Sequence, residues 1–123
     1  MISIGTVVLG VSDIRRAVDF WTRALGYVLR DGAIDPDGTV LVPADGHGPG
    51  LNLTSSGTPP QEHPRVHLDL YAGDAREQEA EVERLVSLGA ERVAWDSYPD
   101  DPDFVVLADP DGNRFCVIDT SHG

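Results

Sequence analysis

The fold class of this chain is decided by residues 11–27, VSDIRRAVDFWTRALGY. Ser12 or Asp13 can cap a helix at its N-terminus, and Gly26 stands where a helix commonly ends in a left-handed residue. Between these ends, apolar residues recur at the spacing of one helix face: Ile14, Ala17, Val18, Trp21, Ala24 and Leu25. The stretch therefore predicts one amphipathic helix over 14–25.

The second half of the chain repeats this pattern. A helix is predicted after Gly73 and Asp74, and it ends at Gly89. Its apolar stripe is formed by Val82, Leu85, Val86 and Leu88. The capping aspartates Asp13 and Asp74 lie 61 positions apart in a chain of 123 residues. Because this spacing is about half of the chain, an internal duplication is the simplest explanation.

Strand-like runs surround both helices and are separated by turns rich in Gly, Pro and Asp. We expect them at 4–11, 27–34, 39–43, 50–54, 65–72, 92–95, 104–108 and 113–119. The order strand, helix, three strands thus occurs twice, which predicts an α+β fold of two βαβββ modules. We expect curved mixed sheets around a central cup, with the helices on the outside.

The chain is expected to form a single domain. The two modules would cover about 1–56 and 65–120, joined by a linker at 57–64 that is rich in Ser, Thr, Gly and Pro. Nine arginines, no lysine and 21 acidic residues leave a net charge of −12, which argues against nucleic acid and anionic membranes as partners. The single cysteine, Cys116, excludes an internal disulfide and a multi-cysteine zinc site.

The apolar N-terminal segment 1–11 has no basic leader and no small-residue cleavage site, so we expect a strand there rather than a signal peptide. No stretch approaches the roughly 20 apolar residues of a membrane span. The expected location is the cytoplasm.

Alternate residues of each strand point to opposite faces of the sheet. One set is apolar and is expected to face the helices: Val7, Leu9, Val11, Leu51, Leu53, Val66, Leu68, Leu70, Phe115 and Val117. The other set mixes small, polar and aromatic residues: Thr6, Val8, Gly10, Asn52, Thr54, His67, Asp69, Tyr71, Arg114, Cys116 and Ile118. Such a mixture favours a ligand cup, although the solvent-exposed face of an antiparallel sheet would have the same mixture of residues.

Three motifs in order resemble the vicinal oxygen chelate superfamily: residues 11–14, Phe20-Trp21 followed by residues 24–27, and residues 109–113. This superfamily includes glyoxalase I, extradiol dioxygenases, fosfomycin-resistance enzymes and bleomycin-binding proteins. The resemblance spans essentially the whole chain and implies the paired βαβββ fold. The stretch 106–117 is similar to the glyoxalase-like branch of the superfamily.

The resemblance also implies four metal-ligand positions, at which metal-dependent members typically carry His or Glu. In this chain they are occupied by Thr6, Asn52, His67 and Cys116. Only His67 matches, and Thr and Asn are weak donors for a divalent metal. We therefore expect neither a metal nor another cofactor.

Two weaker metal hypotheses stay open. His67 with Cys116 could hold a soft ion weakly. His67 and Asp69 also match the His-x-Asp half of an iron site built from two histidines and one carboxylate. The third ligand would then be one of His47, His63 or His122.

The leading hypothesis is a metal-independent protein that binds a small molecule, for instance to sequester a drug or metabolite. Ligand contacts are expected from Thr6, Val8, Asn52, His67, Asp69, Trp95, Phe104 and Cys116. One alternative is an enzyme in which His67 and Asp69 transfer a proton on a small carbonyl or cyclic metabolite. Another alternative is a non-catalytic accessory domain that dimerises, and a homodimer is expected in any case.

Overall fold

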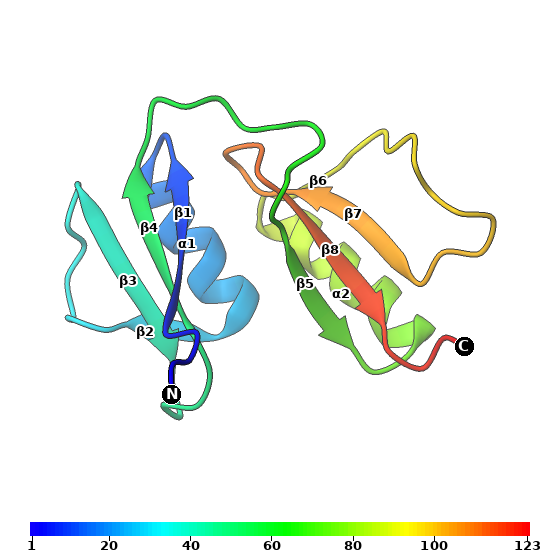
Figure 1. The fold of residues 1–123 in the computed structure, drawn as a ribbon, viewed down its shortest axis with the longest axis horizontal. Coiled ribbons are helices and arrows are strands. Elements are labelled where there is room, and N and C mark those ends of the chain that lie inside the picture. The colour runs from blue at the N-terminus through cyan, green and yellow to red at the C-terminus, as the bar shows by residue number, and fades with distance from the viewer. The chain divides into compact units, whose positions relative to one another are not determined.

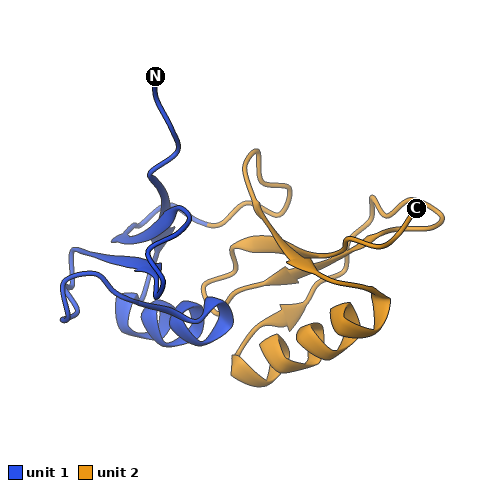
Figure 2. Ribbon diagram, turned by 90° about the horizontal axis from the view of Figure 1, so that it is seen from below, with its two compact units in different colours: residues 1–59 blue, residues 60–123 orange.

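A computed structural model describes residues 1–123, and the chain separates into unit 1, residues 1–59, and unit 2, residues 60–123 (Figures 1 and 2). The boundary lies inside the segment 57–64 that the sequence marks as a linker. Each unit contains one helix and one four-stranded mixed sheet, which confirms the prediction of an α+β fold with two βαβββ modules. Neither helix has the length and apolar character that crossing a membrane requires.

Unit 1 contains the first helix and the first sheet. Its elements are β1 (Thr6–Val11), α1 (Ile14–Leu25), β2 (Tyr27–Leu29), β3 (Gly38–Pro43) and β4 (Gly50–Ser55). The strand order is β1-β4-β3-β2, with β1 parallel to β4 and the other pairs antiparallel. Strand β1 is therefore an edge strand next to the last strand of its own module (Figure 1).

Unit 2 repeats this topology. Its elements are β5 (Leu68–Ala72), α2 (Ala75–Leu88), β6 (Glu91–Arg92), β7 (Phe104–Ala108) and β8 (Arg114–Asp119). The strand order β5-β8-β7-β6 is that of unit 1 with each strand replaced by its counterpart, and β5 is parallel to β8. The shared order supports the internal duplication inferred from the sequence.

Both helices begin at the predicted aspartates. The carboxylate of Asp13 accepts a hydrogen bond from the Arg16 backbone N–H at 3.1 Å, and that of Asp74 accepts one from the Glu77 N–H at 2.8 Å. These bonds satisfy backbone donors that the first helical turn leaves unpaired. Gly26 ends α1 in the left-handed region, with φ of 69°.

Each helix packs on one face of the sheet of its own unit (Figure 2). In unit 1 the buried face of α1 is wider than the predicted stripe, because Phe20 is also buried and packs edge-on against Trp21 with ring centroids 5.0 Å apart. In unit 2 the predicted stripe of α2 is too wide, because Val82 and Leu85 are buried but Val86 is 40% exposed.

The prediction that Val66 faces a helix was wrong, because this side chain is 79% exposed. Strand β5 begins at Leu68, which pairs with Phe115, and the neighbouring strand β8 begins only at Arg114. Residues before His67 therefore have no neighbouring strand to pair with. For a similar reason Ile4 lies outside β1, which begins at Thr6, and is 78% exposed.

Two further predicted strands are also shorter than expected. Strand β2 ends at Leu29 rather than near Ile34, because the chain turns at Gly32, whose φ is 74°. Strand β6 covers only Glu91–Arg92, and residues 93–103 form a long loop that contains Pro99 and Pro102. This loop supplies part of the pocket described next.

Candidate functional site

A pocket with a volume of about 520 Å³ opens within unit 2. Its floor is the face of the sheet that is formed by alternate residues of β5, β7 and β8, and the loop 93–103 supplies part of its wall. The intervening residues of β5 and β8, such as Leu70 and Phe115, occupy the opposite face, on which α2 packs. The pocket residues are Pro64, His67, Asp69, Tyr71, Trp95, Ser97, Asp103, Phe104, Val106, Arg114, Cys116 and Ile118.

Strand register arranges the pocket floor in three rows that change from polar to apolar along β8. Cys116 lies between Asp69 of β5 and Val106 of β7, and Ile118 lies between Tyr71 and Phe104. At the opposite end, Arg114 begins β8, and His67 directly precedes β5. The rows in order are therefore His67 with Arg114; Asp69, Cys116 and Val106; and Tyr71, Ile118 and Phe104.

The predicted proton-transfer pair is in contact. Nε2 of His67 lies 3.0 Å from Oδ1 of Asp69. An ionised carboxylate only accepts hydrogen bonds, so the Nε2–H of His67 is the donor, and in the neutral ring Nδ1 keeps its lone pair. Both side chains are partly exposed, at 42% for His67 and 47% for Asp69, so a solute can reach them.

Cys116 lies in the middle row and is buried. Burial raises the pKa of its thiol to about 11, and the negative charges of Asp69 and Asp103 add to the effect. The reactive form of a cysteine is the thiolate, which is scarce at neutral pH when the pKa is this high. The side chain is therefore a small, weakly polar part of the pocket floor, and its surroundings disfavour a role as nucleophile.

Arg114 is a pocket residue that the sequence-based list of ligand contacts missed. Its Nε is buried and has no hydrogen-bond partner. The sequence did offer one indication, because Arg114 is the only arginine among the strand residues of the mixed face. What the sequence could not show is that no acidic side chain of the chain pairs with it.

Both aromatic side chains that were expected to contact a ligand line this pocket. Trp95 does so from the loop, where its ring lies 4.9 Å from the ring of His63. Phe104 does so from β7, and its ring lies 5.2 Å from that of Tyr98. The Tyr98 hydroxyl accepts a hydrogen bond of 2.7 Å from the Val106 backbone N–H, which ties the loop 93–103 to β7.

His63 connects the loop to the start of unit 2. Its Nε2 lies 3.0 Å from Oδ1 of Asp96, the neighbour of Trp95. This hydrogen bond, followed by one from Ser97, holds the pKa of Asp96 below its ordinary value. The contacts of His63 with Trp95 and Asp96 therefore hold this side of the pocket wall.

Three predicted ligand contacts lie in unit 1, on one face of its sheet. Val8 of β1 pairs with Asn52 of β4, and Thr6 pairs with Gly50. Val8 is 61% exposed, and the buried Oδ1 of Asn52 has no hydrogen-bond partner. None of Thr6, Val8 and Asn52 lines the pocket of unit 2. Their participation in a cup shared by both modules stays a prediction.

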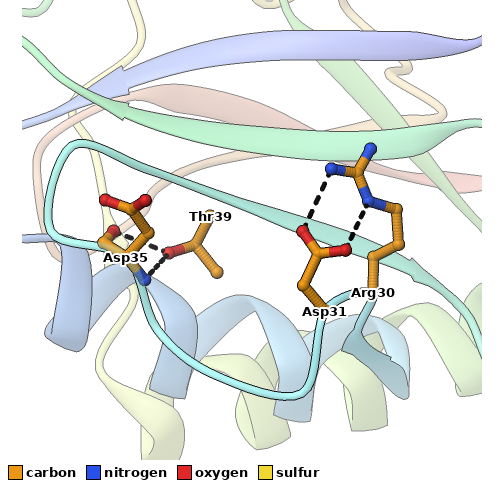
Figure 3. Close-up of polar contacts among 4 residues, drawn as sticks. All are labelled: Arg30, Asp31, Asp35 and Thr39. Carbon is orange, nitrogen blue, oxygen red and sulfur yellow. Dashed lines mark hydrogen bonds and ion pairs between the residues drawn. The ribbon is translucent and has the colours of Figure 1, made fainter.

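Unit 1 has a second cavity of about 430 Å³ beside the loop that joins β2 to β3. Its polar residues Asp35 and Thr39 are bonded to each other, and Asp31 is bonded to the neighbouring Arg30 (Figure 3). Both carboxylate oxygens of Asp31 accept hydrogen bonds from Arg30, which lowers the pKa of Asp31. The Thr39 hydroxyl donates to the Asp35 carbonyl and accepts from the Asp35 N–H. These contacts hold the loop.

The pocket in unit 2 holds only part of a metal-binding set. One donor atom each from His67, Asp69 and Cys116 lies within 4.8 Å of the other two. Cys116 is a thiol at neutral pH, and His67 is already bonded to Asp69. The two other positions implied by the resemblance, Thr6 and Asn52, are neutral. The residues present therefore do not fit the four-ligand metal site of metal-dependent relatives.

Residues 6–118 match the family model described as a glyoxalase-like domain. No curated protein matches the chain.

Several solved structures share the fold. A solution structure from Agrobacterium tumefaciens aligns with a TM-score of 0.76 and 17% identity, covering 97% of this chain and 98% of that one. A glyoxalase/bleomycin resistance protein/dioxygenase family enzyme from Burkholderia phytofirmans aligns with a TM-score of 0.73 and 14% identity, covering 94% and 97%. A fosfomycin resistance protein from Listeria monocytogenes aligns with a TM-score of 0.69 and 16% identity, covering 96% and 91%. At these identities the likeness shows the fold.

Proposed function

Because the chain belongs to the glyoxalase-like domain family, we propose that it binds a small molecule in the pocket of unit 2 without the help of a metal ion. The observation that carries the proposal is the arrangement of the pocket floor, where Asp69 and Cys116 share a sheet face with Tyr71 and Phe104. A few polar groups among apolar and aromatic side chains are what small-molecule sites require.

The size of the pocket supports this function. A volume of about 520 Å³ lies within the range of roughly 300 to 1,000 Å³ that is usual for ligand sites. Two structures of the same fold carry fosfomycin resistance or bleomycin resistance in their names, and both compounds are small molecules. These names support sequestration of a drug or metabolite as the role of this chain.

Metal independence is supported by the donors at the implied positions. Thr6 and Asn52 supply no charge, and the thiol of Cys116 would have to lose a proton at the cost imposed by burial and by Asp69. A ligand would therefore contact the side chains of the pocket directly.

The proposal is tested by following tryptophan fluorescence. The chain has two tryptophans, of which Trp21 is buried in unit 1 and Trp95 lines the pocket. We expect aromatic and heterocyclic compounds to change the emission saturably, with and without EDTA. The variant W95F should lose the emission change while calorimetry still detects binding. A broad panel without any saturable binding would contradict the proposal.

A second candidate function is proton transfer by His67 and Asp69, and the 3.0 Å hydrogen bond between them favours it. Asp69 would orient the imidazole, and Nδ1 of the neutral ring would take a proton from a small carbonyl or cyclic metabolite. This function requires turnover that is lost in both H67A and D69N while both variants still bind the substrate. Loss of binding in both variants would instead indicate that His67 and Asp69 contact the ligand and do not transfer a proton.

The expected oligomeric state and partners can be measured directly. A homodimer would be recognised by its mass in light scattering. Absence of binding to nucleic acid and to anionic vesicles is expected from the net charge of −12.

A further inference from the structure

We propose that the ligand of the unit 2 pocket is an organic anion with an aromatic or apolar body, and that its anionic group pairs with Arg114. This inference rests on the proposed small-molecule function and specifies the class of ligand. The observation that carries it is a cationic side chain that lines a pocket and has no anionic partner within the chain.

The guanidinium of Arg114 is incompletely satisfied. Its Nε is buried and lacks a hydrogen-bond partner, and no acidic residue forms an ion pair with it. A buried donor on a charged group that makes no hydrogen bond lowers the stability of the folded chain. A carboxylate, sulfonate or phosphate on a ligand would satisfy this donor, and a planar guanidinium can bind such a group with two parallel hydrogen bonds.

The other charged side chains of the pocket favour Arg114 as the position of the anionic group. At this end of the floor, Asp69 already accepts a hydrogen bond from His67. At the other end, Asp103 directly precedes Phe104, so its negative charge disfavours an anion there.

The order of the rows specifies the rest of the ligand. Arg114 and Ile118 stand on the same face of β8, four residues apart, which corresponds to roughly 13 Å at 3.3 Å per residue. Between these positions the floor becomes apolar, and it ends at Tyr71, Ile118 and Phe104. A ligand with its anionic group at Arg114 would lay one or two rings over this apolar end.

The test compares 2-naphthoate with its neutral analogue 2-naphthamide, using calorimetry at pH 7. Both compounds carry the same ring system, so the difference in their affinities reports the anionic group. A charge-assisted contact with Arg114 should make naphthoate bind about 10- to 100-fold more tightly than naphthamide. The variant R114Q should abolish this preference, and R114K should keep part of it.

Matched variants separate a local effect from a global one. Arg76 lies exposed on α2, so R76Q removes the same charge away from the pocket and should preserve the preference. D69N removes a negative charge from the row next to Arg114 and should increase the preference for naphthoate over naphthamide. Circular dichroism of each variant verifies that it folds.

The possible outcomes distinguish the two proposals. Equal affinity of the native protein for naphthoate and naphthamide would overturn the anion inference and leave the small-molecule function supported. A preference for naphthoate that survives in R114Q would also overturn the inference. Failure of both compounds to bind the native protein would overturn the inference, whereas the small-molecule function fails only if the broad panel also gives no binding.

Discussion

Asp69 and Cys116 are register partners across the parallel strands β5 and β8, and the carboxylate acts on the thiol. Burial is the larger cause of the high pKa of Cys116, about 11, and the charge of Asp69 is the next. This pair connects a residue expected to contact ligand with one at a position that the family resemblance implies for a metal ligand. It also explains why the Cys116 thiol in the pocket floor is unreactive at neutral pH.

The first prediction concerns the reactivity of Cys116. Because only the thiolate reacts, alkylation by iodoacetamide should be slow at pH 7.4 and should rise with pH to a midpoint near 11. Removing the charge in D69N stabilises the thiolate, so the midpoint of the pH–rate profile should move to lower pH. The measurement is mass spectrometry of alkylated protein over time.

A control for this experiment is D96N, which removes a carboxylate that is exposed and hydrogen-bonded to His63 instead. Its profile should match that of the native protein. A native midpoint near 9.0, the ordinary pKa of a cysteine thiol, would show that the surroundings of Cys116 do not act as described.

The second prediction concerns stability at high pH. The pKa of Cys116 rises on folding from 9.0 to about 11, so the folded state favours the neutral thiol. This contribution to the free energy of unfolding is fully present below pH 9 and is lost as the pH rises through about 11. Urea unfolding between pH 8 and 11 should show a smaller loss of stability in C116A, in which tyrosines still titrate. Parallel curves for the two proteins would refute the effect.

The third prediction concerns metals. Purified protein should contain no stoichiometric Zn, Ni, Fe or Mn by elemental analysis, and EDTA should leave its melting temperature unchanged. Added Zn²⁺ should bind weakly at most, because the thiol of Cys116 must first lose its proton. Stoichiometric metal in the native protein that disappears in both H67A and C116A would show that the three converging donors form a true site.

The fourth prediction concerns Asp109, the first residue of the motif before the last strand. Its side chain is buried and accepts hydrogen bonds from the backbone N–H groups of Asp111, at 3.0 Å, and Asn113, at 2.9 Å. The variant D109A leaves these donors without their acceptor and should lower the free energy of unfolding by about 2 kcal/mol. The motif that carried the family resemblance thus has a structural role in this turn.

The comparison for D109A is D100A, which removes an exposed carboxylate from the loop 93–103. Its free energy of unfolding should change by less than about 0.5 kcal/mol. Equal losses in the two variants would mean that the hydrogen bonds of Asp109 contribute nothing specific.

Local chemistry explains which parts of the fold could be predicted. The helices begin at Asp13 and Asp74 because a carboxylate can bond the N–H group three residues ahead of it, an interaction that depends only on near neighbours. Strand alternation likewise places Asp69 and Tyr71 on one face whatever lies beside them. These features made the modules and the polar face recognisable in the sequence.

Tertiary structure decided what depends on partners distant in the chain. Val66 is exposed because β8 begins too late to pair with it, and Nε of Arg114 has no hydrogen-bond partner in the folded chain. The pKa of Cys116 likewise depends on Asp69, which strand pairing brings beside it. Pairing, burial and charge contacts between distant segments arise only when the chain folds, whereas caps and periodicity are already present in the order of the residues.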